Sequence, residues 1–404
     1  MCPSTIGAVA SDSARKFLQL HLIPDVGPIR TKNLLAHFGS IHTVLQASRA
    51  ELQRVDQIGP RTAEAICRLR GDEAVAKELE LATHHGVRVL CPDDAEFPKL
   101  LLRIDDPPVC IYVRGELQPT DAVAIAIVGT RRCSFYGQEQ AARFGETLGR
   151  AGFTVVSGLA RGVDGLAHRG ALRAGGRTIA VLGNGLCSIY PPEHASLADE
   201  VCAAGAVISE SPMETLPDPG NFPRRNRLIA GLTLGTLVIE AGMKSGALIT
   251  ARCAAEYNRE VFAIPGRIDR PDLSAGVNAL IRDGGAKLVT CLEDILDELK
   301  EVGDIMRRPS NTDAPATSAV APTNSAHASA PIEANAANLT RDHQMSDAQR
   351  SIVSSVQRGA EDIETICSTT GLDSSVVIAQ LTDLQLRGYV RRLPGDRFEC
   401  RRSK

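Results

Sequence analysis

The segment with the most distinctive side-chain chemistry is a helical stretch from Asn221 to Gly231, which contains three arginines and no acidic residue. Pro223 is a residue type favoured at the start of a helix, so we expect the arginines to crowd the first turn, where cations oppose the helix dipole. An anionic ligand would resolve this conflict, and the phenylalanine beside them offers a stacking face for a base. The alternative is a solvated basic turn. The residues expected at the ligand are Phe222, Arg224, Arg225, Asn226 and Arg227.

A second phosphate-binding pattern follows the apolar run Ala124–Val128. Gly129 and Thr130 are small enough to let a ligand approach the backbone, and a helix predicted after this loop would point its N-terminus toward an anion. Arg131 adds a side chain that binds phosphate in a bidentate manner. The loop contains neither the dinucleotide fingerprint Gly-x-Gly-x-x-Gly nor the P-loop pattern. Taken alone, it also fits a polar turn that binds nothing.

Two acidic residues have open roles. Glu240 ends an apolar run, and the polar turn Lys244, Ser245 and Gly246 follows it, as in turns that cradle phosphate and in the Gly-Thr-x-x-Glu loops of nucleotide-processing enzymes. Asp164 and His168 are four residues apart on one face of a predicted helix. Such a pair would suit a general base. We favour a structural interpretation, in which the aspartate starts the helix and the histidine packs.

The elements that must position these loops form an alternating series. Short runs that are apolar throughout indicate strands covered on both faces, and longer helical stretches separate them. Alternation of this kind predicts an α/β fold, a Rossmann-like doubly wound parallel sheet with ligands at the carboxyl ends of its strands. The predicted strands are Ala124–Val128, Phe153–Val156, Thr178–Leu182, Ala206–Ser209, Gly235–Glu240 and Val261–Ile264. The predicted helices are Gly137–Ala151, Val163–Ala174, His194–Ala204, Arg225–Leu232 and Leu248–Glu256.

Smaller modules flank this domain, which we place at 95–300. Residues 1–85 have helical periodicity and two similar turns, Ile23–Thr31 and Val55–Ala63, which resemble helix-hairpin-helix (or SAM-like) hairpins although the usual second glycine is missing from both. Alternatively, these hairpins only pack. Residues 303–344 are rich in Ala and Pro and poor in large apolar residues, which predicts a disordered linker. Residues 345–404 resemble a winged helix with a basic end, whose ligand stays open between DNA and protein.

Composition excludes several classes of protein. Lys and Arg number 45 against 48 Asp and Glu, a net charge of −3, so the chain is not a globally basic nucleic-acid binder. Aromatic residues are only 3%, which argues against rows of stacking platforms. The eleven cysteines show no metal-site or secreted disulfide spacing. We therefore expect no metal, no cofactor, no signal peptide, no membrane span and a cytoplasmic location.

Taken together, the loops resemble the DNA-processing protein A (DprA/Smf) family over about 97–289, in the order in which the family has them. The most specific pieces are Phe222–Arg227, Val238–Ala241 and Ser245–Ala251. Further matches are Val128–Arg131, Tyr136–Gly137, Ser157–Ala160, Gly162–Asp164, Ala167–His168, Pro265–Gly266, Ser274–Asn278 and Leu280–Ile281. Thr130 departs from the serine that is common in the family, which is a conservative change.

The resemblance implies a non-catalytic protein of natural transformation that binds incoming single-stranded DNA, protects it and loads the RecA recombinase. It also implies a homodimer formed through the Rossmann-like domain, with phosphates at Arg131 and at the arginines from Arg224 to Arg227. One alternative is a nucleoside-monophosphate phosphoribohydrolase that uses Glu240 as its base. Against it, the Gly-Gly-x-Gly-Thr-x-x-Glu loop and a second acid are absent. A purely structural adaptor would leave the arginine turn unexplained.

Overall fold

The computed structural model describes residues 9–68, 73–299, 346–358 and 362–372, together with 376–377, 380–381, 384, 389–393 and 397–400. The chain divides into two units, Met1–Thr312 and Asp313–Lys404. The predicted linker over 303–344 lies outside the described residues, and the four predicted domain boundaries stay predictions. Within the described ranges, no helix is both long enough and apolar enough to cross a lipid bilayer.

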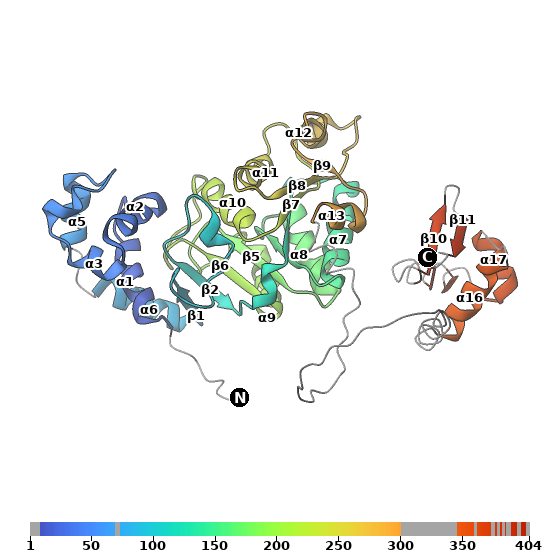
Figure 1. Cartoon of the computed structure of the whole chain (residues 1–404), viewed down its shortest axis with the longest axis horizontal. Helices are drawn as coiled ribbons and strands as arrows, with labels where there is room; N and C mark the ends of the chain where they lie inside the picture. The colour runs from blue at the N-terminus through green and yellow to red at the C-terminus, as the bar shows by residue number, and fades with distance from the viewer. Residues whose placement is uncertain are drawn as a thin grey trace, which may run out of the picture. The chain divides into compact units, whose positions relative to one another are not determined.

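Among the described residues of the first unit, nine strands form one sheet in the order β1-β2-β6-β5-β4-β3-β7-β8-β9 (Figure 1). Strands β3 to β9 pair in parallel, whereas β2 is antiparallel to both of its neighbours. The strands are β1 (Val87–Leu90), β2 (Ile111–Gly115), β3 (Ala124–Val128), β4 (Thr154–Ser157), β5 (Thr178–Leu182), β6 (Ala206–Ser209), β7 (Gly235–Val238), β8 (Glu260–Ala263) and β9 (Lys287–Leu288). The six predicted strands are therefore confirmed, and the parallel core is extended by an antiparallel pair at one edge.

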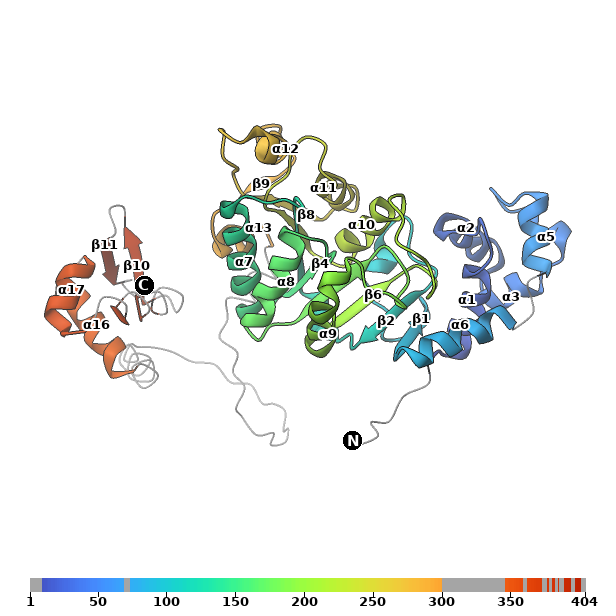
Figure 2. The same cartoon turned by 180° about the vertical axis from the view of Figure 1, so that it is seen from behind.

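Helices cover both faces of this sheet (Figure 2). Those of the sheet domain are α7 (Phe135–Arg150), α8 (Val163–Arg173), α9 (Ala195–Ala204), α10 (Asn221–Gly231), α11 (Ala247–Glu256), α12 (Pro271–Arg282) and α13 (Leu292–Glu298), with short 3-10 turns η1 (Leu101–Arg103), η2 (Pro119–Ala122) and η3 (Pro192–His194). Alternate residues of β3 point to opposite faces: Ile125 and Ile127 pack with α7, α8 and α13, whereas Ala126 and Val128 pack with α10, α11 and α12. Burial on both faces explains why the strand runs are apolar throughout.

The N-terminal module is helical, as predicted, and packs against β1 through α6. Its helices are α1 (Asp12–His21), α2 (Pro28–Phe38), α3 (Ile41–Gln46), α4 (Arg49–Leu52), α5 (Pro60–Arg68) and α6 (Glu73–His84). The two hairpins lack a second glycine, yet Asp25 and Gln57 adopt the left-handed backbone conformation there, with φ of 67° and 63°. The turn geometry that glycine usually provides is therefore kept by residues with side chains, at a local conformational cost.

The second unit contains α16 (Asp347–Gln357), α17 (Ile363–Thr370) and the antiparallel strands β10 (Val390–Leu393) and β11 (Arg397–Cys400). An antiparallel strand pair after two helices fits the winged helix that the sequence of 345–404 predicts. The buried side chains of this unit form their own cluster, so it has a separate core.

Candidate nucleic-acid interface

A cavity of about 920 Å³ opens at the carboxyl ends of β3 and β7. In the sheet, β4 lies on one side of β3 and β7 lies on its other side. The strand order therefore reverses between β3 and β7, and ligands of open α/β sheets bind at such a point. We call it the switch-point cavity. Its lining includes nearly all the predicted site residues, namely Gly129, Thr130, Arg131, Phe222, Arg225, Asn226, Lys244, Ser245 and Gly246. Arg224 and Arg227 are not among the lining residues.

Arg131 and Phe222 come from different loops and meet at the wall of this cavity. The Arg131 guanidinium carbon is 5.2 Å from the Phe222 ring centroid, a cation–π distance. The ring of Tyr190 packs against the same Phe222 ring, with 5.7 Å between the two ring centroids. Within the described residues, Arg131 forms no ion pair, and its side chain is exposed. The stack therefore orients a guanidinium whose charge is available to a ligand.

The Arg131 loop is fixed by close backbone contacts. Gly162, at the start of α8, has φ of 74°, and a Cβ there would lie 2.5 Å from the Thr130 carbonyl oxygen. The Val163 N–H donates to that same oxygen at 3.3 Å. A side chain at this glycine would therefore push the loops that follow β3 and β4 apart.

Arg225 lies beneath the cavity. Only 7% of the residue is exposed, and its Nη1 donates to the carbonyl oxygens of Gly158, at 2.8 Å, and of Val181. Burial lowers the pKa of Arg225 to about 10, which leaves it charged at neutral pH. Burial also raises the pKa of the Asp164 carboxyl, an effect that the Arg225 charge opposes. Arg225 therefore joins the loop after β4 to the C-terminal end of β5 and supplies a positive floor.

Arg227 has a different role from the one predicted. It is 8% exposed, and its Nη2 donates to both carboxylate oxygens of Glu210 at 2.5 Å. Its Nη1 donates to the Asp106 carbonyl at 2.7 Å, and Nε lies 3.2 Å from the Asp106 carboxylate. The expectation that an anionic ligand compensates the arginines is thus wrong for Arg227, because the protein's own acids, Glu210 and Asp106, compensate it.

The position at which α10 starts also reduces the predicted conflict between its arginines and the helix dipole. The helix begins at Asn221, so Pro223 is its third residue rather than its first. Arg225 and Arg227 therefore lie in the second turn, where the helix dipole has little effect. Arg224 is exposed and lines a second cleft on the other side of the turn.

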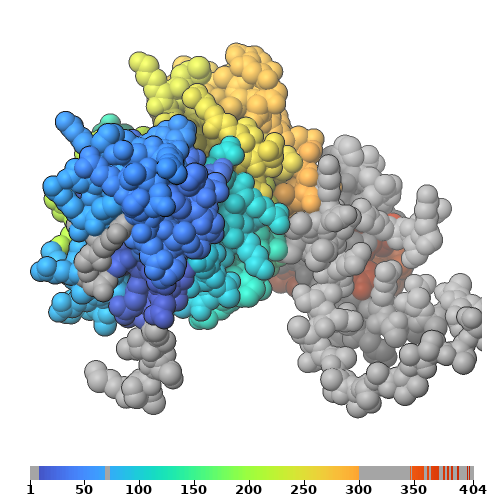
Figure 3. All heavy atoms as spheres, turned by 60° about the vertical axis from the view of Figure 1, so that its left-hand side comes forward, coloured from blue at the N-terminus to red at the C-terminus, as the bar shows by residue number. Residues whose placement is uncertain are grey.

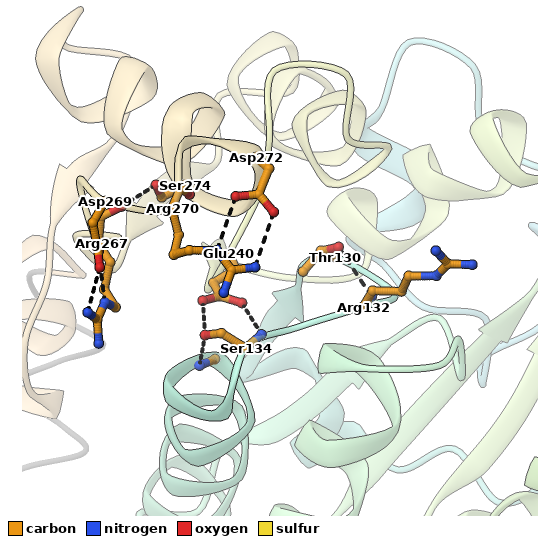
Figure 4. Close-up of polar contacts among 10 residues, drawn as sticks. Thr130, Arg132, Ser134, Glu240, Arg267, Asp269, Arg270, Asp272 and Ser274 are labelled. Atoms are coloured by element: carbon orange, nitrogen blue, oxygen red, sulfur yellow. Dashed lines mark hydrogen bonds and ion pairs between the residues drawn. The ribbon is translucent and has the colours of Figure 1, made fainter.

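Glu240 occupies the N-terminus of α7 (Figure 4). Its carboxylate accepts from the Ser134 backbone N–H at 2.9 Å and from the Ser134 hydroxyl at 2.5 Å. A Cβ on Gly137 would collide with the same carboxylate, so the glycine allows this approach. The anion that we expected at this helix N-terminus is thus the protein's own. Glu240 is 3% exposed and does not line the cavity, so this carboxylate is not placed to act as the base that the hydrolase alternative assigned to it.

Asp164 and His168 do not form a catalytic pair. Asp164 accepts from the Gly158 backbone N–H at 3.1 Å, whereas the His168 ring bonds to the Thr178 hydroxyl at 2.7 Å. Both residues are buried. This geometry supports the structural interpretation, because each polar group secures a neighbouring loop or strand.

Several lining residues were not predicted. Arg132 is one of them, and it is an exposed cation like the predicted Lys244; neither of the two forms an ion pair in the part of the chain that the structure describes. Asp272 brings an acid to the rim, but Arg270 pairs with it at 3.2 Å (Figure 4). Met243 is 65% exposed at the mouth, an apolar side chain within a polar turn. That contrast with its sequence neighbours was the signal that could have identified Met243.

The fold and the cavity define a Rossmann-like protein with a cationic site at its switch point. The family model for DNA recombination-mediator protein A matches residues 88–300, a helix-hairpin-helix model matches 17–77, and a DprA winged helix model matches 329–396. The chain belongs to the DNA-processing protein A (DprA/Smf) family.

Individual relatives agree with this assignment. Protein Smf of Escherichia coli is 40% identical over 327 residues, which cover 80% of each chain. DNA processing protein DprA of Bacillus subtilis is 40% identical over 217 residues, which cover 54% of this chain and 72% of the relative. The X-ray structure of DNA processing protein A from Streptococcus pneumoniae is similar with a TM-score of 0.62 and 33% identity, and the match covers 70% of this chain and 97% of that one.

Proposed function

We propose that this protein is a non-catalytic, cytoplasmic DNA-binding protein whose switch-point cavity holds single-stranded DNA during DNA uptake. The observation that carries the proposal is the Arg131–Phe222 stack at a cavity with further exposed cations, Arg132 and Lys244. Phosphates fit the cations, and a base fits the aromatic and apolar wall. A base inside a duplex is stacked and paired, so only an unpaired base has both a free face and a free edge to present here.

The binding experiment is fluorescence anisotropy with labelled oligo-dT and a matching duplex across a salt series. Contacts to three cations predict a slope of about −2 in log K against log salt, because each phosphate contact on a single strand contributes about −0.7. Arg131→Ala is expected to weaken single-strand binding about tenfold, in line with the loss of one charge-assisted contact, and to make the slope shallower by about 0.7.

Arg150→Ala is the matched control, since Arg150 is an exposed arginine at the opposite end of α7. It should bind like the wild type. Tighter binding to duplex than to single strands, or equal affinities of the two variants, would refute the proposed site.

We further propose that the protein shields the bound strand, loads the RecA recombinase and acts as a homodimer through the Rossmann-like domain. Membership of the family, whose model is described as a DNA recombination-mediator protein, supports the proposed role in recombination. One edge of the sheet supports the dimer: Leu288 in β9 pairs with Ala263 of β8 and is exposed, and Ile268, just after β8, is 92% exposed.

Ile268→Glu is expected to shift the protein from dimer to monomer, because a carboxylate cannot be buried in an apolar contact without a partner. Sedimentation velocity measures this shift. Nuclease protection and RecA filament assembly on protein-coated DNA measure the other two roles. A wild-type protein that is monomeric at all concentrations, or that inhibits RecA assembly, would contradict these proposals.

A further inference from the structure

A second cleft lies between the helical module and α10, with a volume of about 460 Å³. Its walls come from the first hairpin of the module, from the loop after β6 and from the start of α10. We call it the hairpin cleft. Arg225 lines both this cleft and the switch-point cavity, so the two sites share a wall. Figure 3 shows the helical module, in blue, lying directly against the rest of the first unit.

Polar contacts hold the module in place beside the cleft. Lys32, in α2, donates to the Asp105 carbonyl at 2.8 Å. Glu78, in α6, is buried and accepts from the Met213 backbone N–H at 2.7 Å. These contacts hold the module against the segment before β2 and against the loop after β6, which also forms a wall of the cleft.

The cleft is rich in positive charge and in free donors. Arg30 and Arg224 line it, and neither has an ion-pair partner among the described residues. Arg30 is held over the hairpin by a bond to the Asp25 carbonyl. Helices α2 and α10 both begin here with a glycine N-cap that provides no side-chain acceptor. Residues of both first turns line the cleft, and both helix dipoles favour an anion there.

A buried donor provides an independent sign of a missing ligand. Arg225 is more than nine-tenths buried, and its Nε has no hydrogen-bond partner within the described part of the chain. An unpaired buried donor is costly, so an acceptor is expected beside it. Of the two acids at the cleft, Glu210 is already paired with Arg227, and only Asp25 leaves an exposed carboxylate.

We propose that the hairpin cleft binds a backbone phosphate of the same DNA strand that occupies the switch-point cavity. This inference rests on the proposed function and extends it, because the helical module then contributes directly to the DNA path. The two hairpins are not equivalent: the first faces α10, whereas the second, at Gly59 and Pro60, lines neither site.

The test is anisotropy of the full chain with labelled oligo-dT in a length series from about 3 to about 16 nucleotides, the span of single-strand site sizes. Arg30→Glu is expected to weaken binding of the longest oligomers about fivefold and to make their salt slope shallower by about 0.7. The shortest oligomers, which fill only the switch-point cavity, should bind as before. Arg224→Glu should behave in the same way, and it lies on an exposed part of α10, so it keeps the test valid if Arg30→Glu disturbs the hairpin.

The matched control is Arg61→Glu, the same charge reversal in the first turn of α5 at the second hairpin. It should bind like the wild type at every length. Equal effects of Arg30→Glu and Arg61→Glu, or an effect of Arg30→Glu that is independent of length, overturn the inference. If Arg30→Glu weakens binding of thymidine monophosphate but not of long strands, the cleft is a mononucleotide site and the shared path is overturned. If the wild type binds no oligomer, the proposed function fails as well.

Discussion

Replacing Arg227 with methionine is expected to lower the free energy of unfolding by about 3–5 kcal/mol, the cost of leaving one member of a buried ion pair without its partner. Arg227 donates to both oxygens of Glu210 and to the Asp106 carbonyl. Without it, Glu210 is left in an environment where burial already raises the pKa of its carboxyl. Urea denaturation followed by circular dichroism measures the loss.

Arg224→Met is the matched control for this prediction. It removes the same charge from the same helix, but the side chain is exposed, so the expected change in stability is within about 0.5 kcal/mol. A double variant, Arg227→Met with Glu210→Met, should recover much of the loss, because replacing both members of a buried pair removes the uncompensated charge. Equal stabilities of the Arg227→Met and Arg224→Met variants would show that the buried pair contributes nothing.

This prediction also separates folding from binding. Helix α10 carries Phe222 near its start and Arg227 five residues later, and of these two residues only Phe222 lines the cavity. An Arg227 variant that loses DNA binding would do so because α10 has moved, whereas an Arg131 variant would lose binding with its stability intact. Arg131 and Arg227 both come from arginine-containing segments of the sequence. Only their surroundings in the structure distinguish the binding role of Arg131 from the stabilising role of Arg227.

The parallel core could be predicted from the sequence, because strands buried on both faces leave a continuous apolar run. The runs at Ala124–Val128, Thr178–Leu182 and Ala206–Ser209 match β3, β5 and β6 residue for residue. The added strands could not be recognised in this way. In β1 and β2, Arg88 and Arg114 interrupt the apolar pattern, since these strands lie at or near an edge of the sheet.

The sequence predicts a site residue well where a local pattern reveals its role. It predicts the role less well where the partners of the side chain are distant in the chain. Arg227 pairs with residues 17 and 121 positions away, which no local pattern shows. Glu240 reaches Ser134 across 106 positions. Arg225 is different: it shares a helical face with Leu228, Ile229 and Leu232, and this spacing was a usable signal that its side chain is buried.

A pH-dependent loss of stability is expected from His168, in α8. Its Nδ1 lies 2.7 Å from the Thr178 hydroxyl, which donates its own proton to the Val155 carbonyl at 2.7 Å. The hydroxyl therefore accepts from the ring, so Nδ1 carries the proton of the neutral imidazole. Nε2 is buried and has no hydrogen-bond partner among the residues that the structure describes, so a second proton there would meet no acceptor among them.

Burial, with smaller contributions from the charges of His194 and Arg225, lowers the pKa of His168 to about 3. The unfolded chain binds a proton near pH 6.5 and the folded chain does not. Stability from this group is therefore complete above pH 6.5 and falls as the pH decreases, by about 1.4 kcal/mol per pH unit, until about pH 3. His21, whose pKa burial lowers to about 4, acts in the same direction.

His168→Asn tests this expectation, because the asparagine amide can donate to Thr178 without titrating. The variant should be less stable than the wild type at pH 7, since the smaller side chain leaves a void. The difference between the two proteins should then shrink as the pH falls from 6.5 toward 4, because only the wild type has to exclude a proton from Nε2. The exposed His42 provides the control, and His42→Asn should leave the pH profile of the wild type unchanged. Parallel profiles of the wild type and His168→Asn, measured by urea denaturation at each pH, would mean that His168 takes up its proton in the folded state as readily as in the unfolded chain.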